Sequence, residues 1–284
     1  MTPALNILSF DIEEWFMSYD SSQIPVKQWK AMPARIEQNI HDILHFLESS
    51  HLIATFYIMG WVAEQHPSLV KDIFAAGHEI GYHSYYHESP LMQGPKAFEE
   101  DLVRGLDLLQ SLTGQKVMQY RAPRFSLDCA TAFALPLLHK HGITLSSSVM
   151  SGHRCNGHVL PAHPFIFDVQ GIQMPEVPLN RKQTLGLQWV YTGSGYFRLL
   201  PLWLIKSLYA ASPYNMAYFH PRDFDTQVPK TKLLPFYRNI MSNLGNHSTL
   251  PKLKHLITQC PFQSVGKAWQ HYQQTQSDIT ILYL

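Results

Sequence analysis

Apolar segments that alternate between strand and helix periodicity constrain the fold of the first half of this chain. Runs with β character occupy residues 6–13, 53–59, 79–82, 117–121 and 143–149. Between them, apolar residues recur at helical spacing over residues 33–50, 67–77, 98–114 and 128–141. Strands that alternate with helices form right-handed parallel units, so this order predicts an α/β fold with a closed or partly closed barrel.

The first predicted strand, residues 6–13, carries two carboxylates at its C-terminal end. Strand alternation places Asp11 and Glu13 on one face, with their Cα atoms about 7 Å apart, and directs Glu14 to the other face. One carboxylate can bind a metal while the other acts as a general base on water. Catalytic groups gather at such strand ends in barrels, although an isolated Asp-x-Glu pair is by default a solvated strand end.

A histidine pair follows the third predicted strand. His83 and His87, together with a strand-end carboxylate, can hold a divalent metal and leave positions open for water and substrate. The spacing alone is weak, because 16 histidines in 284 residues give about one such pair by chance, and His41 and His45 form another. The neighbouring motifs favour His83 and His87 as the functional pair.

Two further predicted strand ends carry basic residues. Arg121 can pair with Asp11 and keep it ionised and oriented, and the backbone N–H of Arg124 can donate to a developing oxyanion. His220 follows a strand at residues 215–219 and is placed to protonate a leaving group. Taken singly, Arg121 could equally form a structural salt bridge, and His220 could cap a turn.

Composition narrows the class of protein. The chain is 45% hydrophobic and 15% charged, which suits one domain over residues 1–284, and a net charge of +1 without a basic block argues against a nucleic-acid partner. Three widely spaced cysteines predict no disulfide framework, and we expect no role for Cys129 and Cys260. The first residues lack a basic segment and no apolar run reaches about 20 residues. We therefore expect a cytoplasmic protein, with the inner membrane face as an alternative location.

The second half is less regular. From residue 151 to 185 the periodicity breaks, with short strands expected at 165–169 and 174–177. Four potential metal ligands in this region are irregularly spaced, at His153, Cys155, His158 and His163. Their spacing favours a substrate-facing loop over a second zinc-type site. An apolar helix at 199–211 is expected to pack against the barrel, with peripheral membrane contact as the alternative.

Together these motifs resemble those of a known family. The order Phe-Asp-x-Glu, Gly-His-Glu-Ile-Gly-x-His-x3-His, Tyr-Arg-Ala-Pro-x-Phe and Phe-His-Pro is similar to that of the polysaccharide deacetylases of carbohydrate esterase family 4, the NodB homology domain. Residues 193–201 and the tail after His220 resemble the branch associated with exosortase and exopolysaccharide loci. The resemblance implies a deformed (β/α)7 barrel, with an irregular insertion at 151–198 and a C-terminal helical extension at 222–284.

The resemblance also implies an activity and residue roles. The activity is removal of an N-acetyl group from an amino sugar of a bacterial surface polysaccharide, exopolysaccharide or precursor, with a divalent metal, most simply zinc. Asp11 is implied as the base and His220 as the acid. His83 and His87 are implied as metal ligands, and Arg121 as the residue that orients Asp11.

The chain departs from the commonest family pattern at several positions. Ile12 stands where a second aspartate is usual, so Glu13 is the implied third metal ligand. Family members hold the acid histidine with a carboxylate; Glu176 is the first candidate and Asp223 the second. Arg222 stands where close relatives carry an aromatic residue. The predicted contacts to the substrate or oxyanion are Arg124, Phe125 and Trp15. The Trp15 ring could stack on a sugar or could equally pack at the barrel rim.

Three other functions fit part of the pattern. A glycosidase would pair Asp11 with Glu176 or Asp225 and cleave chains without a metal. A non-catalytic family member would bind saccharide in the same groove without a metal. An Fe(II) oxygenase could use two histidines and one carboxylate, but its chemistry needs no counterpart of Arg121 and His220.

Overall fold

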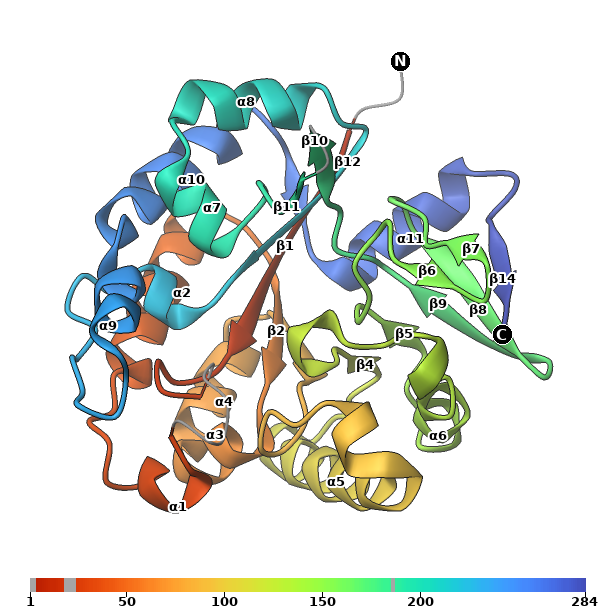
Figure 1. The fold of residues 1–284 in the computed structure, drawn as a ribbon, viewed down its shortest axis with the longest axis horizontal. Helices are drawn as coiled ribbons and strands as arrows, with labels where there is room; N and C mark the ends of the chain where they lie inside the picture. Colours follow the sequence, from red (N-terminus) through yellow and green to blue (C-terminus); the bar gives the residue numbers. More distant parts are fainter. Residues whose placement is uncertain (1–3, 18–23, 185–186) are drawn as a thin grey trace.

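A computed structural model describes residues 4–17, 24–184 and 187–284 (Figure 1). Its centre is a curved sheet with a parallel run of strands in the order β12 (Tyr214–Phe219), β1 (Leu5–Ile12), β2 (Thr55–Ile58), β3 (Glu79–Tyr82), β4 (Gln119–Tyr120), β5 (Leu145–Ser146) and β9 (Ile172–Glu176). This confirms the predicted α/β fold of the deformed (β/α)7 type. No strand pair joins β9 to β12 within the described residues, so the barrel is open there.

Side chains bridge the opening between β9 and β12. Asn180, which follows β9, donates from Nδ2 to the carbonyl of Tyr214 (3.0 Å) and accepts at Oδ1 from the backbone N–H of Met216 (2.9 Å). The Tyr214 hydroxyl donates to the carbonyl of Pro178. A buried amide therefore satisfies backbone groups of β12 that a neighbouring strand would otherwise pair.

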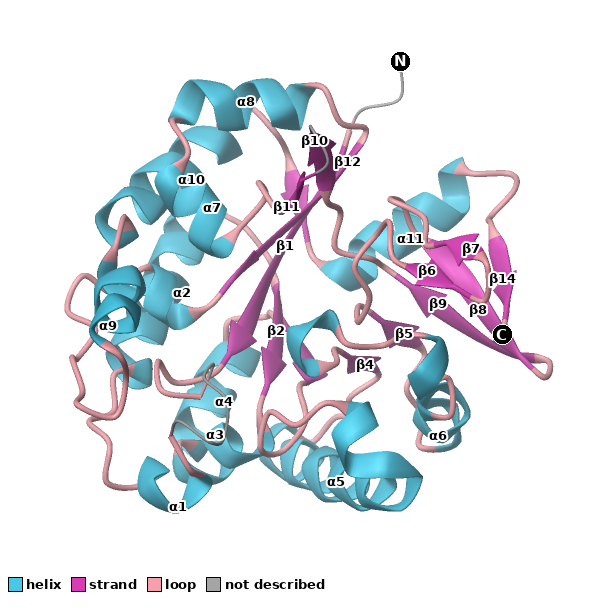
Figure 2. Cartoon of the chain, viewed as in Figure 1, coloured by secondary structure: helices cyan, strands magenta, loops and turns pink. Residues whose placement is uncertain are grey.

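Helices surround the parallel strands (Figures 1 and 2). Those of the first half are α1 (Val26–Trp29), α2 (Ile36–Ser49), α3 (Gly60–Gln65), α4 (Pro67–Ala75), α5 (Pro90–Thr113) and α6 (Ala134–Lys140). The apolar stripe of α2 is buried through Ile36, Ile40, Ile43 and Leu47. The predicted helix positions are confirmed, because each amphipathic stripe needs the sheet to cover it, except that the segment predicted from residue 128 forms a 3-10 helix, Cys129–Thr131, before α6 begins at Ala134.

The strands predicted at 117–121 and 143–149 are shorter in the structure. β4 and β5 have 2 residues each, and polar loops follow them. The Ser148 hydroxyl accepts from the backbone N–H of Ala122 (2.9 Å), and the backbone N–H of Ser147 donates to the carbonyl of Tyr120 (3.0 Å). Side-chain hydrogen bonds replace part of the strand ladder here, which frees the chain to turn into the site.

The second half adds strands at the sheet edge and a helical tail. β8 (Phe165–Val169) pairs antiparallel with β9, and β14 (Ile281–Tyr283) pairs with β8. β13 (Phe262–Gln263) lies beside β1. Two small antiparallel pairs are β6 (Arg154–Cys155) with β7 (His158–Val159), and β10 (Lys182–Thr184) with β11 (Leu187–Trp189). The helices are α7 (Ser194–Leu199), α8 (Leu202–Ala210), α9 (Phe236–Asn243), α10 (Thr249–Ile257) and α11 (Val265–Thr275). The strands expected at 165–169 and 174–177 are confirmed, and β9 belongs to the central sheet. Within the described ranges, no helix has the length and apolar character needed to cross a membrane.

Cys129 and Cys155 form a disulfide, so the prediction that no disulfide exists is wrong. Their Cα atoms lie 5.3 Å apart although the two residues are separated by 26 positions. The bond links the short 3-10 helix Cys129–Thr131 to the β6–β7 hairpin. Cysteine spacing could not show this, because the pairing depends on which loops fold together. Cys260 is a free, half-buried thiol.

Candidate active site

A polar pocket lies at the C-terminal ends of β1 and β12. It has a volume of about 270 Å³, and the predicted site residues that line it are Asp11, Glu13, His87, Arg124, Phe125 and His220. The ends of parallel strands meet at one edge of a sheet, which brings together residues that are more than 200 positions apart. Arg222 also lines the pocket.

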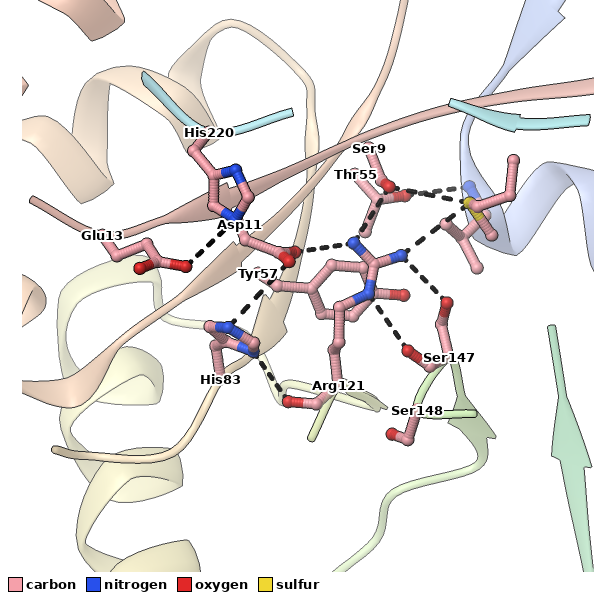
Figure 3. Close-up of polar contacts among 12 residues, drawn as sticks. Ser9, Asp11, Glu13, Thr55, Tyr57, His83, Arg121, Ser147, Ser148 and His220 are labelled. Carbon is pink, nitrogen blue, oxygen red and sulfur yellow. Dashed lines mark hydrogen bonds and ion pairs between the residues drawn. The ribbon is translucent and has the colours of Figure 1, made fainter. Parts of the chain in front are cut away.

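Arg121 holds Asp11 in one orientation (Figure 3). The guanidinium is fully buried, and its Nη1 lies 2.6 Å from Asp11 Oδ1. It also donates to the Ser9 hydroxyl (3.0 Å) and, through Nε, to the carbonyl of Ser147 (3.0 Å), while the ring of Tyr57 stacks beneath it at 4.0 Å. A buried ion pair is tolerated because each donor is satisfied, and it fixes the direction of the Asp11 carboxylate.

His83 presents an unpartnered nitrogen to the same space. Its Nδ1 lies 2.8 Å from the carbonyl of Arg121, and since a carbonyl only accepts, Nδ1 carries the hydrogen. Among the described residues, the buried Nε2 has no hydrogen-bond partner, and it lies 4.0 Å from Asp11 Oδ2. A buried imidazole nitrogen without a partner is the group that a metal ion would satisfy.

Glu13 and His87 complete a set of potential ligands. One atom each from Glu13, His83 and His87 lies within 4.8 Å of the others, and Glu13 Oε1 is 3.5 Å from His87 Nε2. Burial lowers the pKa of His87 to about 4, so its imidazole is neutral and keeps a lone pair. His87 has a left-handed backbone (φ 60°), which costs about 1 kcal/mol and turns its side chain into the site.

The Glu13 carboxylate is held ionised. Burial alone would raise its pKa, but the charges of Arg222 and protonated His220 outweigh burial and lower the pKa well below its usual value. Arg222 Nη1 lies 3.2 Å from Oε2, on the other side of the carboxylate from His87. Two imidazoles and one carboxylate match the ligands of open divalent-metal sites, so these residues fit the metal that the sequence implied. Asp11, Glu13 and His220 form a second close group, but His220 is committed to two carboxylates.

His220 is paired with Asp223, not with Glu176. His220 Nδ1 lies 3.1 Å from Asp223 Oδ2, and His220 Nε2 lies 3.2 Å from Glu13 Oε1. Burial and Arg222 lower the pKa of His220, but Glu13 and Asp223 outweigh them and raise it to about 9. The imidazole therefore carries a proton at neutral pH, as a general acid must.

The prediction that Glu176 holds the acid histidine is therefore wrong. The 3-10 turn Pro221–Asp223 folds Asp223 back onto His220, whereas Glu176 lies in β9 and accepts from the backbone N–H groups of Ser148 (2.7 Å) and Val149 (3.1 Å). Burial raises the pKa of Glu176 to about 7. Glu176 thus supports the loop after β5.

The predicted substrate contacts divide into two groups. Phe125 and Arg124 line the pocket, both with left-handed backbones (φ 53° and 60°). The Phe125 N–H donates to the carbonyl of Ala122 (3.0 Å), so that group is used within the turn, and the Arg124 N–H stays the predicted oxyanion donor. Trp15 is only 1% exposed, and its Nε1 donates to the carbonyl of Pro33 (2.9 Å). The prediction that Trp15 stacks on a sugar is therefore wrong, because the ring packs in the core.

Two carboxylates considered for other roles lie elsewhere. Asp225 forms two hydrogen bonds with Arg35 (2.9 Å each). Since Glu176 accepts from the loop after β5, neither carboxylate is placed to act with Asp11 as a glycosidase pair. Glu14, directed away from the site as expected, accepts at Oε1 from the backbone N–H groups of Arg35 (2.7 Å) and Ile36 (3.0 Å). It satisfies the first turn of α2.

Several supporting residues escaped the sequence reasoning. Ser147 holds Arg121, and Arg198 Nε lies 3.6 Å from Asp223. At Gly193 a Cβ would lie 1.8 Å from the carbonyl of Tyr218, so only glycine lets this loop approach β12. The run of three serines at 146–148, at a predicted strand end, was the available signal for Ser147.

Two family models match successive parts of this chain, and curated proteins match its sequence. Residues 15–146 match the family model described as polysaccharide deacetylase, and residues 146–270 match a domain of unknown function (DUF3473). A peptidoglycan deacetylase of Helicobacter pylori is 32% identical over 136 residues, 48% of this chain and 45% of that protein. A peptidoglycan-N-acetylglucosamine deacetylase of Bacillus cereus is 31% identical over 81 residues, 28% of this chain and 30% of that protein. The chain thus spans less than half the length of these relatives.

A solved structure extends the likeness to the whole fold. A Mycobacterium smegmatis protein assigned as a polysaccharide deacetylase superposes with a TM-score of 0.65 at 18% identity, covering 99% of this chain and 98% of that one. The curved parallel sheet thus has the deformed-barrel fold of that structure. The first half of the chain is thus similar to the polysaccharide deacetylase family.

Proposed function

We propose that this protein is a metal-dependent deacetylase that removes the N-acetyl group from an amino sugar of a bacterial surface polysaccharide, exopolysaccharide or precursor. The observation that carries the proposal is the unpartnered Nε2 of His83, which faces Glu13 and His87 beside an oriented Asp11. Two relatives named as deacetylases, one from H. pylori and one from B. cereus, support it. Membership of the exosortase-associated branch stays a prediction.

Glu13, His83 and His87 would hold the metal, most simply zinc. When bound, such an ion polarises a carbonyl and makes water more acidic. Asp11 is oriented by Arg121 so that Oδ2 can take a proton from the attacking water. Glu13 would thus help to hold the metal, while Asp11 accepts the proton.

His220 and Arg124 act on the other parts of the acetamide. Protonated His220, held by Asp223, gives its proton to the departing amine nitrogen. The Arg124 backbone N–H donates to the oxygen that gains negative charge. Acetate and a free amino sugar are the products.

Metal content tests the site directly. Plasma mass spectrometry on purified protein should find near one divalent ion per chain, and Glu13→Ala and His87→Ala should each lose it. His45→Ala is the matched control, because this exposed residue belongs to the other spacing-four histidine pair on α2. A metal-free wild type after addition of zinc or cobalt would overturn the ligand set.

Acetate release tests the reaction. Wild type loaded with metal should release acetate from N-acetylglucosamine oligomers, and chelation should stop the release. Shortened saccharide chains without acetate would instead indicate a glycosidase. Metal binding together with saccharide binding and no acetate would indicate a non-catalytic family member.

A further inference from the structure

Helix α9 is oriented with its apolar side toward solvent. Phe236 is 80% exposed, Tyr237 58%, Ile240 46% and Met241 47%. Leu233 before the helix (42%) and Leu244 after it (44%) extend the same spacing. We call these residues the α9 patch: Leu233, Phe236, Tyr237, Ile240, Met241 and Leu244. These are 6 of the 15 large apolar side chains that are exposed in the described ranges, so the exposed apolar surface is concentrated here.

The polar side of α9 faces the protein. Asn239 donates to the carbonyls of Thr231 (2.9 Å) and Leu234 (3.2 Å), and Asn243 donates to the carbonyl of Val228 (3.2 Å). An ordinary surface helix buries its apolar stripe and exposes its polar one. α9 does the reverse, and hydrogen bonds fix it in that orientation.

The end of α9 is tied to the catalytic strand end. Asn246 donates from Nδ2 to the carbonyls of Arg222 (2.9 Å) and Asp225 (2.6 Å), and Arg198 donates to the carbonyl of Ser242 (3.3 Å). The α9 patch is therefore a fixed surface of the folded domain, at the edge of the ribbon in Figure 1.

The surroundings of the patch are basic. Lys230, Lys232 and Arg238 are exposed beside it, and residues 226–277 contain six Lys and Arg but no Asp or Glu. Charge is distributed unevenly along the whole chain. Residues 177–284 contain eleven Lys and Arg and three Asp, whereas residues 1–176 contain eleven Lys and Arg and eighteen Asp and Glu. Two of the three late acids, Asp223 and Asp225, are buried.

We propose that the α9 patch binds the surface of an anionic lipid bilayer as an interfacial helix. An apolar stripe with an aromatic residue enters the boundary between headgroups and acyl chains, while flanking Lys and Arg contact anionic headgroups. A symmetric contact between two copies is disfavoured, because it would bring Lys230, Lys232 and Arg238 of both copies together without acidic partners in this segment. The inference does not depend on the proposed deacetylase function.

Vesicle co-sedimentation of the full chain tests the proposal. Binding to an equimolar mixture of phosphatidylcholine and phosphatidylglycerol should be at least roughly ten-fold stronger than to phosphatidylcholine alone, and it should weaken as salt is added. The paired variant Phe236→Ser with Ile240→Ser should lose roughly ten-fold in binding to the mixed vesicles. Lys230→Glu with Lys232→Glu should weaken binding to mixed vesicles only.

Leu91→Ser with Met92→Ser is the matched control. These side chains on α5 are 62% and 71% exposed but lie in the acid-rich part of the chain, so binding should not change. All substituted side chains are exposed, and unchanged melting curves would show that the variants fold. Equal binding by the α9 variants and wild type would overturn the proposal. A second result would also overturn it: wild type that does not bind vesicles but forms a dimer in light scattering, with the dimer lost in the Phe236→Ser, Ile240→Ser variant.

Discussion

Residues 1–146 supply the proposed base and metal ligands, whereas residues 147–284 supply the proton donor and much of the bracing. In the first part, Glu13 and His83 directly follow strands β1 and β3, and His87 lies in the loop after β3 with a left-handed backbone. In the second part, His220 depends on the ion pair with Asp223. The two parts correspond closely to the segments matched by the two family models, which meet at residue 146.

The difference separates two kinds of residue. Those of the first part touch the proposed reaction directly, and changing them should remove activity or metal. Apart from His220, the proposed proton donor, those of the second part set protonation states and hold loops, as Ser147 does when it accepts from Arg121. Changing them should shift pH profiles and stability instead. Four substitutions test this division, from the largest expected effect to the smallest.

Asp11→Asn should break the reaction without disturbing the metal. A neutral amide cannot take a proton from water, so the rate of acetate release should fall roughly 1000-fold, about 4 kcal/mol in the barrier. Metal content, measured on the same sample, should stay at the wild-type level. Asp42→Asn, on the exposed side of α2, controls for loss of a charge. Full activity of Asp11→Asn would remove Asp11 from the role of base.

Cys155→Ser should show how much the disulfide between the two parts contributes to the free energy of unfolding. Its bond to Cys129 closes a loop of 26 positions, so its loss should lower the free energy of unfolding by about 3 kcal/mol. Chemical denaturation with and without a reductant measures this. The reductant should lower the midpoint of wild type and leave that of the variant unchanged; a wild type insensitive to the reductant would contradict the bond.

Glu176→Gln should change how stability depends on pH. The raised pKa of Glu176 means that the folded protein binds this proton more tightly than the unfolded chain does. Wild type should therefore lose stability as pH rises from about 4.5 to about 7. The variant does not bind this proton and keeps an amide oxygen for Ser148 and Val149, so it should gain roughly 3 kcal/mol relative to wild type by pH 8. Parallel pH curves would show that Glu176 stays ionised throughout.

Asp223→Asn should shift the pH profile with a modest loss of rate. Asp223 helps raise the pKa of His220 to about 9, and the acid must be protonated to act. Without that charge, the pKa of His220 falls and activity is lost at a lower alkaline pH than in wild type. At neutral pH we expect roughly a ten-fold slower reaction. A pH–rate profile whose alkaline limb does not move would show that Asp223 only packs against His220.

Local patterns predicted most of the fold. The strand at 79–82 and the strand at 165–169 have the predicted bounds, because alternation and flanking turns are local properties. The strands expected at 117–121 and 143–149 were too long, since beyond Tyr120 and Ser146 the two segments turn, and the Ser148 hydroxyl accepts from the backbone N–H of Ala122. The pairing of β14 with β8 was not predicted, because it joins segments more than 100 residues apart.

The sequence by itself determined which side chains reach the strand ends, because side-chain direction along a strand follows from a repeat of two residues. Asp11 and Glu13 were found in this way, and His83 was found as part of the histidine pair that follows the third strand. Only the tertiary structure decided their partners: Asp223 rather than Glu176 at His220, Cys155 at Cys129, and the core rather than the pocket for Trp15. Such contacts depend on how distant loops meet, and a linear spacing carries no measure of that distance.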